Sequence, residues 1–310
     1  MSPTSRTDGR AVAAVVAAAA LFGTTGTAQE LGPDGTTPLG LGSLRILIGT
    51  MALWLLAARS IRSLRRLDRN GWIFVAIGGI GVAGYQPTFL AGTERSGVAL
   101  GTVVALGSGP VFAGLVDVVR TRRMPPSTWL AATATSITGG VLLVSSGGGA
   151  ARFDLVGILA ALAAGASYAL YADTTKRLII SGVGSTAALA ASFTVGTVLL
   201  LVLAAGEPFG WVGTPGGLAL LGHLGLVTIG VAYWLYGYGL RHVPVPKAVT
   251  LTLAEPVTAA MLGVVVLDER IAPLGWAGIA LVLAGLALAA RDPERRAEED
   301  VPGTSLTAML

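Results

Sequence analysis

The chain has 310 residues, of which 53% are hydrophobic and only 12% are charged. Soluble domains carry about 25% charged residues, and a soluble fold of this size could not enclose so much apolar surface. We therefore expect a membrane protein, in which the formal net charge of +4 reflects orientation rather than nucleic-acid binding. With no cysteine and two histidines, the sequence leaves little material for a metal centre, so we expect no cofactor, metal or nucleic-acid partner.

Apolar segments recur along the whole chain, each close to the ~20 residues that cross a ~30 Å hydrocarbon layer. The first, from Ala11 to Phe22, follows Arg6 and Arg10 and could be a secretory signal. Nine similar segments follow it, so we interpret it as the first of ten spans. They lack the alternation of barrel strands, which favours an all-α membrane protein. The expected spans are 11–29, 39–58, 72–92, 97–116, 128–146, 155–174, 185–205, 217–240, 246–267 and 273–290.

Basic residues between the spans predict the orientation. The N-terminus, the C-terminal tail and alternate connections carry all but four of the 21 Lys and Arg residues. The other connections hold only Arg95, Arg152 and Arg270, and Arg45 lies inside the second span. This distribution predicts a multi-pass protein of the bacterial inner membrane with both termini in the cytoplasm. Four tryptophans near helix ends fit interfacial anchoring: Trp72, Trp129, Trp211 and Trp276.

Landmarks that recur at a nearly fixed offset indicate an internal duplication. We expect residues 1–150 and 151–291 to form two five-helix repeats, followed by a disordered cytoplasmic tail at 292–310. Because five is odd, the second copy must enter the membrane from the opposite face, which is the arrangement behind alternating access. A single matched pair is weak evidence of a duplication in a chain rich in Ala and Gly. The pairs 146 residues apart are Asp8 and Asp154, Gly84 and Gly230, Arg95 and Arg241, and Pro110 and Pro256, with Thr50 and Thr197 at 147.

Several segments carry a family resemblance. They are ALFGTTGTAQEL in the first span, LGSLRILIGTMALWLLA in the second, GSGPVFAGL in the fourth, ASYALYADTTKR in the sixth and LAEPVTAAMLGVVVLDERIAPLGWAGIALVLAGL across the last two. The most specific piece is Glu255 and Pro256 followed by Asp268 and Glu269. From about residue 9 to 291, the chain resembles the EamA-type ten-helix branch of the drug/metabolite transporter superfamily.

The resemblance implies a 5+5 inverted-repeat secondary carrier without an ATP-binding site, and the sequence has no GxxxxGK[ST] motif. It implies a central cavity lined mainly by spans three, four, eight and nine. Members of this branch move amino acids, other metabolites or drugs, often outward. The fourth span has Gly109 before Pro110 where the ninth has Glu255 before Pro256, so only one repeat carries the acidic residue.

Glu255 lies near the middle of the ninth span, where a charged side chain costs about 2.5–3.5 kcal/mol on insertion scales. Pro256 lacks an N–H and should leave a carbonyl near residue 252 unpaired, which predicts a kink. Glu255 therefore contacts a substrate amine or carries a proton, or else it makes a packing hydrogen bond or ion pair. The sequence leaves these alternatives open.

Arg45 lies about six residues inside the second span. It could pair with Glu255, hold a substrate carboxylate, or extend its long stem to the outer headgroups. His223, at similar depth in the eighth span, titrates near neutral pH in its unperturbed state and so would suit proton coupling. A lone histidine near a helix end is also commonly structural.

Polar and aromatic residues in three other spans are further candidates for the binding site. Gln86, with Pro87 after it, resembles a broken-helix polar site, and the amide offers both a donor and an acceptor. Tyrosine and tryptophan side chains could line a cavity or serve only in packing. The candidates are Tyr85, Tyr168, Tyr171, Tyr233, Trp234, Tyr236 and Tyr238.

The favoured function is a secondary transporter, expected to export a small metabolite, amino acid or drug. Its partners would be this solute and membrane lipid, with a proton or counter-substrate as the coupling partner; the oligomeric state is left open. The alternative is a polytopic membrane enzyme that acts on a lipid-linked substrate. Such an enzyme needs clustered acidic, histidine or arginine side chains at one membrane face, whereas the polar residues here are scattered through the depth of the membrane. No enzymatic activity is therefore expected.

Overall fold

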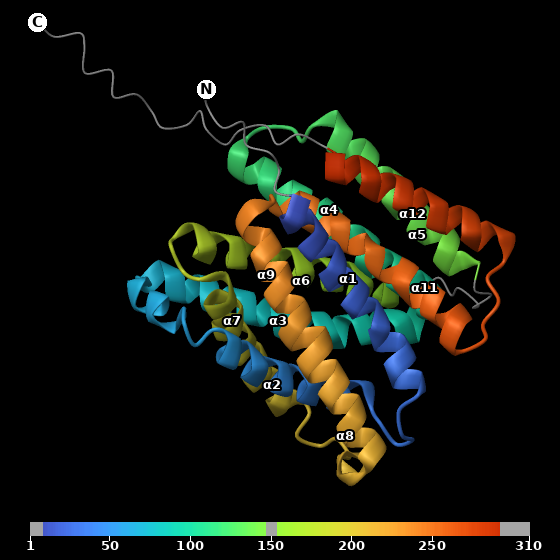
Figure 1. Ribbon diagram of the computed structural model, residues 1–310, viewed down its shortest axis with the longest axis horizontal. Coiled ribbons are helices and arrows are strands. Elements are labelled where there is room, and N and C mark those ends of the chain that lie inside the picture. The colour runs from blue at the N-terminus through green and yellow to red at the C-terminus, as the bar shows by residue number, and fades with distance from the viewer. Residues whose placement is uncertain (1–8, 147–153, 292–310) are drawn as a thin grey trace, which may run out of the picture.

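The computed structural model describes residues 9–146 and 154–291, and within these ranges the chain is helical with no β-strand. Ten helical segments are long and apolar enough to cross a membrane, which confirms the expected number (Figure 1). Asp8, Arg152 and the tail at 292–310 lie outside the described residues.

Five segments form the first half of the chain and five form the second. The first five are α1 (Gly9–Glu30), α2 (Pro38–Leu56), α3 (Arg69–Ser96), α4 (Val98–Thr121) and α5 (Ser127–Ser145). The sixth, seventh and tenth are α6 (Leu155–Ile180), α7 (Ser185–Leu203) and α12 (Pro273–Arg291). The eighth joins α8 (Pro215–Gly222), the π-helix η3 (His223–Val231) and α9 (Ala232–His242), and the ninth joins α10 (Val245–Leu251), the 3₁₀ turn η4 (Thr252–Ala254) and α11 (Glu255–Val266). Two connections contain the short 3₁₀ helices η1 (Ile61–Arg66) and η2 (Gly210–Gly213).

Side-chain caps explain where several spans begin. A helix leaves its first N–H groups without partners, and a short oxygen-bearing side chain before the first turn accepts from one of them. Asp68 accepts from the N–H of Gly71 at 2.8 Å, and Asp154 from that of Gly157 at 2.7 Å. Thr37 caps α2 in the same way.

The fourth and sixth spans extend beyond their expected ends, to Thr121 and Ile180. The sequence predicts an end at residue 174 for the sixth span, yet Lys176 and Arg177 lie inside its last turns. Arg177 pairs with Asp173 at 2.6 Å, and the Lys176 ammonium donates to the carbonyl of Leu240 at 2.5 Å. The helix continues because these partners satisfy the charges at the edge of the bundle.

Of the four expected interfacial anchors, Trp72 and Trp276 are about half exposed at helix starts. Trp129 and Trp211 are buried, so their expected anchoring role is wrong. The indole N–H of Trp211 donates instead to the carbonyl of Pro208 at 3.1 Å.

The spans pack in pairs that join the two halves of the chain. α3 lies along α6, and α1 lies against α9 and α11. α2 packs on α7, and α5 and α12 form an adjacent pair at one edge of the bundle (Figure 1). The fully buried side chains of Tyr236 and Phe193 lie in the core between these pairs.

Among the spans that the structure describes, only the ninth is interrupted at its proline. Pro256 follows the 3₁₀ turn η4, and the N–H of Glu255 donates to the carbonyl of Thr252, which proline cannot use. Pro87 and Pro110 lie inside the continuous helices α3 and α4. The expected broken helix at Gln86 and Pro87 is therefore wrong, because α3 is packed against α6 on both sides of the proline.

Candidate functional site

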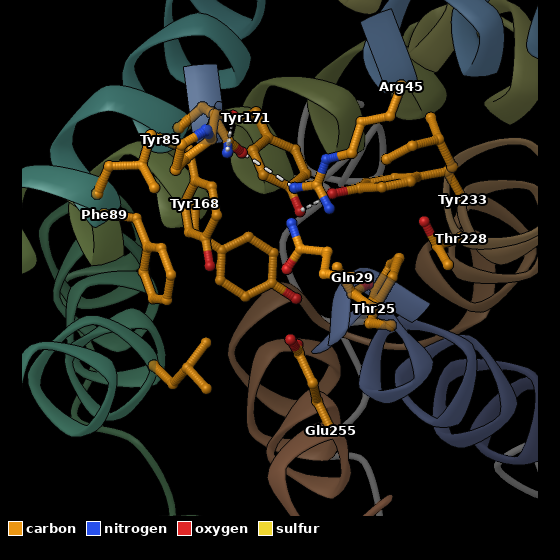
Figure 2. Close-up of a pocket in the computed structure, with 16 residues that line it drawn as sticks. Thr25, Gln29, Arg45, Tyr85, Phe89, Tyr168, Tyr171, Thr228, Tyr233 and Glu255 are labelled. Carbon is orange, nitrogen blue, oxygen red and sulfur yellow. Dashed lines mark hydrogen bonds between the residues drawn. The ribbon is translucent and has the colours of Figure 1, made fainter. Parts of the chain in front are cut away.

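A cavity of about 250 Å³ lies inside the helix bundle (Figure 2). Its walls come from seven spans. Four of them, represented by α3, α4, η3 with α9, and α11, are those that the resemblance names, and α1, α2 and α6 are additional. The lining residues are Phe22, Thr25, Gln29, Pro38, Arg45, Tyr85, Gln86, Phe89, Leu90, Leu106, Tyr168, Tyr171, Thr228, Ile229, Tyr233 and Glu255.

Arg45 and Gln86 form a polar wall of this cavity. Arg45 Nη2 donates to Gln86 Oε1 at 3.0 Å, and Gln86 Nε2 donates to the carbonyl of Pro38 at 3.5 Å. Gly42 leaves room for the Gln86 side chain, since a Cβ there would lie 2.8 Å from it. The Arg45 side chain thus enters the cavity instead of extending to the headgroups.

Glu255 reaches into the cavity from the opposite side (Figure 2). It begins α11 directly after the 3₁₀ turn, and α1 crosses it closely at Gly23. A Cβ on Gly23 would lie 2.6 Å from the Glu255 carbonyl oxygen, so only glycine permits this approach. Within the described residues, no hydrogen bond or ion pair occupies the Glu255 carboxylate.

Tyrosine rings close the inner side of the cavity. The hydroxyls of Tyr171 and Tyr233 share a hydrogen bond of 3.1 Å. The hydroxyl of Tyr168 shares one of 2.8 Å with Thr252 in the 3₁₀ turn, which links α6 to the segment that carries Glu255. The Tyr85 ring stacks on Phe89 with centroids 5.7 Å apart. These bonds and ring contacts fix the shape of the cavity.

Six of the eight candidate site residues from the sequence line the cavity: Arg45, Tyr85, Gln86, Tyr168, Tyr233 and Glu255. The other two do not. Trp234 is 45% exposed, and His223 bonds through Nε2 to the hydroxyl of Thr24 at 2.8 Å. Tyr171 also lines the cavity, whereas Tyr236 is buried behind it.

Three polar lining residues escaped the sequence analysis: Thr25 and Gln29 on α1, and Thr228 on the π-helix. Phe22, Thr25 and Gln29 follow one another at spacings of three and four, which places them on one helix face. That spacing could have indicated the α1 wall. Nothing in the sequence marks the π-helix that presents Thr228.

The arrangement brings both signs of charge into one aromatic chamber. The Arg45 guanidinium supplies hydrogen-bond donors and positive charge, and Glu255 supplies a carboxylate. The amides of Gln29 and Gln86 offer donors and acceptors between them. Among the described residues, no group of three or more acidic or histidine side chains could hold a metal ion.

Comparisons with known proteins identify the family. The EamA-like transporter family matches residues 9–146 and 155–291. A transporter of Bacillus subtilis (strain 168), YwfM, is 38% identical over 282 residues, covering 91% of this chain and 94% of its own. A protein of Streptantibioticus cattleyicolor named "Probable terminal-alkyne amino-acid exporter" is 27% identical over 95% of this chain and 98% of its own. A crystal structure with a TM-score of 0.77 and 22% identity shares the fold over 90% of this chain and 96% of its own. This chain is a multi-pass membrane protein that belongs to the EamA-like transporter family.

Proposed function

We propose that the protein is a secondary carrier for a small zwitterionic metabolite, such as an amino acid with an apolar side chain. One observation carries the proposal: the Arg45 guanidinium and the Glu255 carboxylate face the same cavity without an ion pair between them. A substrate carboxylate would bind near Arg45 and a substrate amine near Glu255. Each protein charge would then gain its partner only when the substrate is bound.

Size and lining support a metabolite over a drug. Drug-sized ligands occupy pockets of roughly 300–1,000 Å³, and this cavity measures about 250 Å³. Aromatic side chains such as Phe22, Phe89 and Tyr233 would contact the apolar part of the substrate. Export is the proposed direction, supported by the exporter name of the Streptantibioticus relative. Transport would be coupled either to a proton carried by Glu255 or to the movement of a counter-substrate.

Alternating access would use two repeats, residues 1–150 and 151–291. The family matches each half separately, at 9–146 and 155–291. The contacts between spans agree with two repeats. The third span, α3, packs on the sixth, α6, and α9 of the eighth span packs in the corresponding way on α1, the first. Thr50 and Thr197, 147 residues apart, bond to each other at 2.9 Å. Equivalent residues would meet in this way beside a two-fold axis, so the contact supports the proposed relation between the halves.

The proposed setting is the bacterial inner membrane, with both termini in the cytoplasm. Residues 59–71, between the second and third spans, carry five arginines, whereas their counterpart at 206–216 carries no Lys or Arg. This asymmetry supports the orientation. The alternative function, an enzyme acting on a lipid-linked substrate, has no comparable support from the named relatives, which are transporters.

Counterflow into proteoliposomes tests the substrate class. Liposomes loaded with leucine should accumulate external radiolabelled leucine, and an excess of external leucine should compete. Isoamylamine lacks the carboxylate and 4-methylvalerate lacks the amine, so each should compete at least about tenfold more weakly. Equal competition by either analogue would contradict zwitterion recognition. Glu94→Gln, an exposed acid at the end of α3, serves as the control and should retain wild-type exchange.

A further inference from the structure

Four charged residues form a cluster near the end of the bundle where α1 begins and α12 ends, here called the terminal end. Arg120 Nη2 pairs with Asp117 at 2.8 Å, and Arg177 Nε pairs with Asp173 at 2.6 Å. Arg120 Nη1 also lies 3.7 Å from Asp173 and so joins α4 to α6. The Arg177 guanidinium lies over the Phe74 ring of α3, 5.3 Å from its centroid. The cluster thus connects three helices.

This cluster and the cavity lie on opposite sides of an aromatic layer. Tyr168 and Tyr171 line the inner side of the cavity, and the fully buried Tyr236 packs behind Tyr168. Asp173 follows Tyr171 by two residues toward the terminal end of α6. The cavity itself extends toward Gln29 and Pro38, at the other end of the bundle. The terminal end is therefore closed by two layers, first aromatic rings and then ion pairs.

Among the described residues, the symmetry-related positions at the other end of the bundle hold no equivalent cluster. At the 146-residue offset, Asp117 and Arg120 correspond to Gly263 and Val266 in α11, and none of the four counterparts is ionisable. The counterparts of Asp173 and Arg177 are Thr27 and Leu31. The ion pair of Arg95 with Asp154 at the far end is largely exposed and joins α3 to the start of α6, which already pack along each other.

We infer that the Arg120–Asp173 pair is a latch that holds the carrier with its terminal end closed. In an inverted repeat, the two alternative packings are equal in energy only if the two halves are equivalent. A latch on one face shifts this balance toward the state in which that face is closed. Because Arg120 is 39% exposed, the pair is weak enough to open in each cycle. The inference rests on the proposed alternating-access function.

The chain has no cysteine, so single cysteines can report access to each face without substrate. Ala113→Cys, buried one turn from Asp117, reports opening of the terminal end, and Thr25→Cys reports access to the cavity. An impermeant maleimide is applied to right-side-out and inside-out vesicles of the full chain. In Asp173→Asn and Arg120→Gln, labelling at position 113 should rise about three- to fivefold and labelling at position 25 should fall. Arg95→Gln, which removes the ion pair with Asp154, should leave both rates unchanged.

Arg120→Lys keeps the charge and should restore most of the wild-type labelling, which a general loss of packing would not do. Unchanged labelling in well-folded Asp173→Asn and Arg120→Gln would overturn the latch. An equal rise in Arg95→Gln would also overturn it, because any lost ion pair would then suffice. The readout needs no substrate, so failure of leucine counterflow alongside the expected labelling would count against the proposed substrate and not against the latch.

Discussion

Glu255 is the residue whose chemistry most directly tests the proposed carrier. Glu255→Gln keeps the size and hydrogen-bonding capacity of the side chain but removes its charge and its proton. We predict that the variant inserts and folds normally and that its leucine exchange falls at least about tenfold, because the substrate amine loses its charged partner. Exchange that remains should no longer vary with pH, which initial rates measured at each pH will show.

Glu94→Gln removes an acid outside the cavity and should change neither the exchange rate nor its pH profile. A Glu255→Gln protein with wild-type rates and pH response would leave only a packing role for Glu255. The binding site would then have to be centred on Arg45 and Gln86.

At the scale of single residues, the free-energy cost of burying polar groups in a membrane made the polar residues of the cavity predictable. Glu255, Arg45 and Gln86 stood out because each is expensive in an apolar span, and the structure brings all three into one cavity. Aromatic residues carry no such signal. Tyr233 lines the cavity while its neighbour Trp234 faces outward, because the direction of a side chain depends on how the helix is rotated in the bundle.

Between elements, the crossing of α1 and α11 positions Glu255. A methyl group on Gly23 would lie 2.6 Å from the Glu255 carbonyl oxygen and 2.7 Å from the Thr258 Cβ. Gly23→Ala should therefore force the helices apart, lower stability by about 1–3 kcal/mol and reduce exchange at least about tenfold. Thermal unfolding in detergent and leucine counterflow measure the two effects.

Gly26 provides a matched control on the same helix. A Cβ there would meet nothing within 4 Å, so Gly26→Ala should be neutral or slightly stabilising, since alanine favours a helix by about 1 kcal/mol. If the two variants behaved alike, helix propensity rather than the close crossing would explain the result.

The number and order of the membrane-spanning helices were predictable from the sequence, because an apolar segment of this length has few conformations other than a helix in a membrane. The local form of the eighth and ninth spans was less predictable. Pro256 predicted a kink near residue 252, where the structure has the 3₁₀ turn η4, but Pro87 and Pro110 do not interrupt their helices. Neither the continuity of these helices nor the π-helix η3, where Ile229 approaches Gly49 of α2, has a signal in the sequence.

At the scale of the whole molecule, the proposed symmetry predicts how the contact between Thr50 and Thr197 behaves during transport. Their hydroxyls lie 2.9 Å apart between α2 and α7, and each is the counterpart of the other at the 147-residue offset. When the two repeats exchange conformations, a contact between residues i and j becomes a contact between their counterparts. A contact between two counterparts is mapped onto itself, so this one should persist in both states.

A disulfide at this position should therefore be tolerated. In the cysteine-free chain, Thr50→Cys with Thr197→Cys should cross-link under mild oxidation and keep leucine exchange within about twofold of the reduced protein. Cysteines in place of Thr133 and Thr250, whose hydroxyls also lie 2.9 Å apart, have the different pair Ile279 and Val104 as symmetry counterparts, so that cross-link should block exchange. Mobility on non-reducing gels measures cross-linking, and counterflow before and after reduction measures activity. If closing the Thr50–Thr197 bridge abolished exchange, the two residues would separate during transport, and the two halves could not be related by an axis beside them.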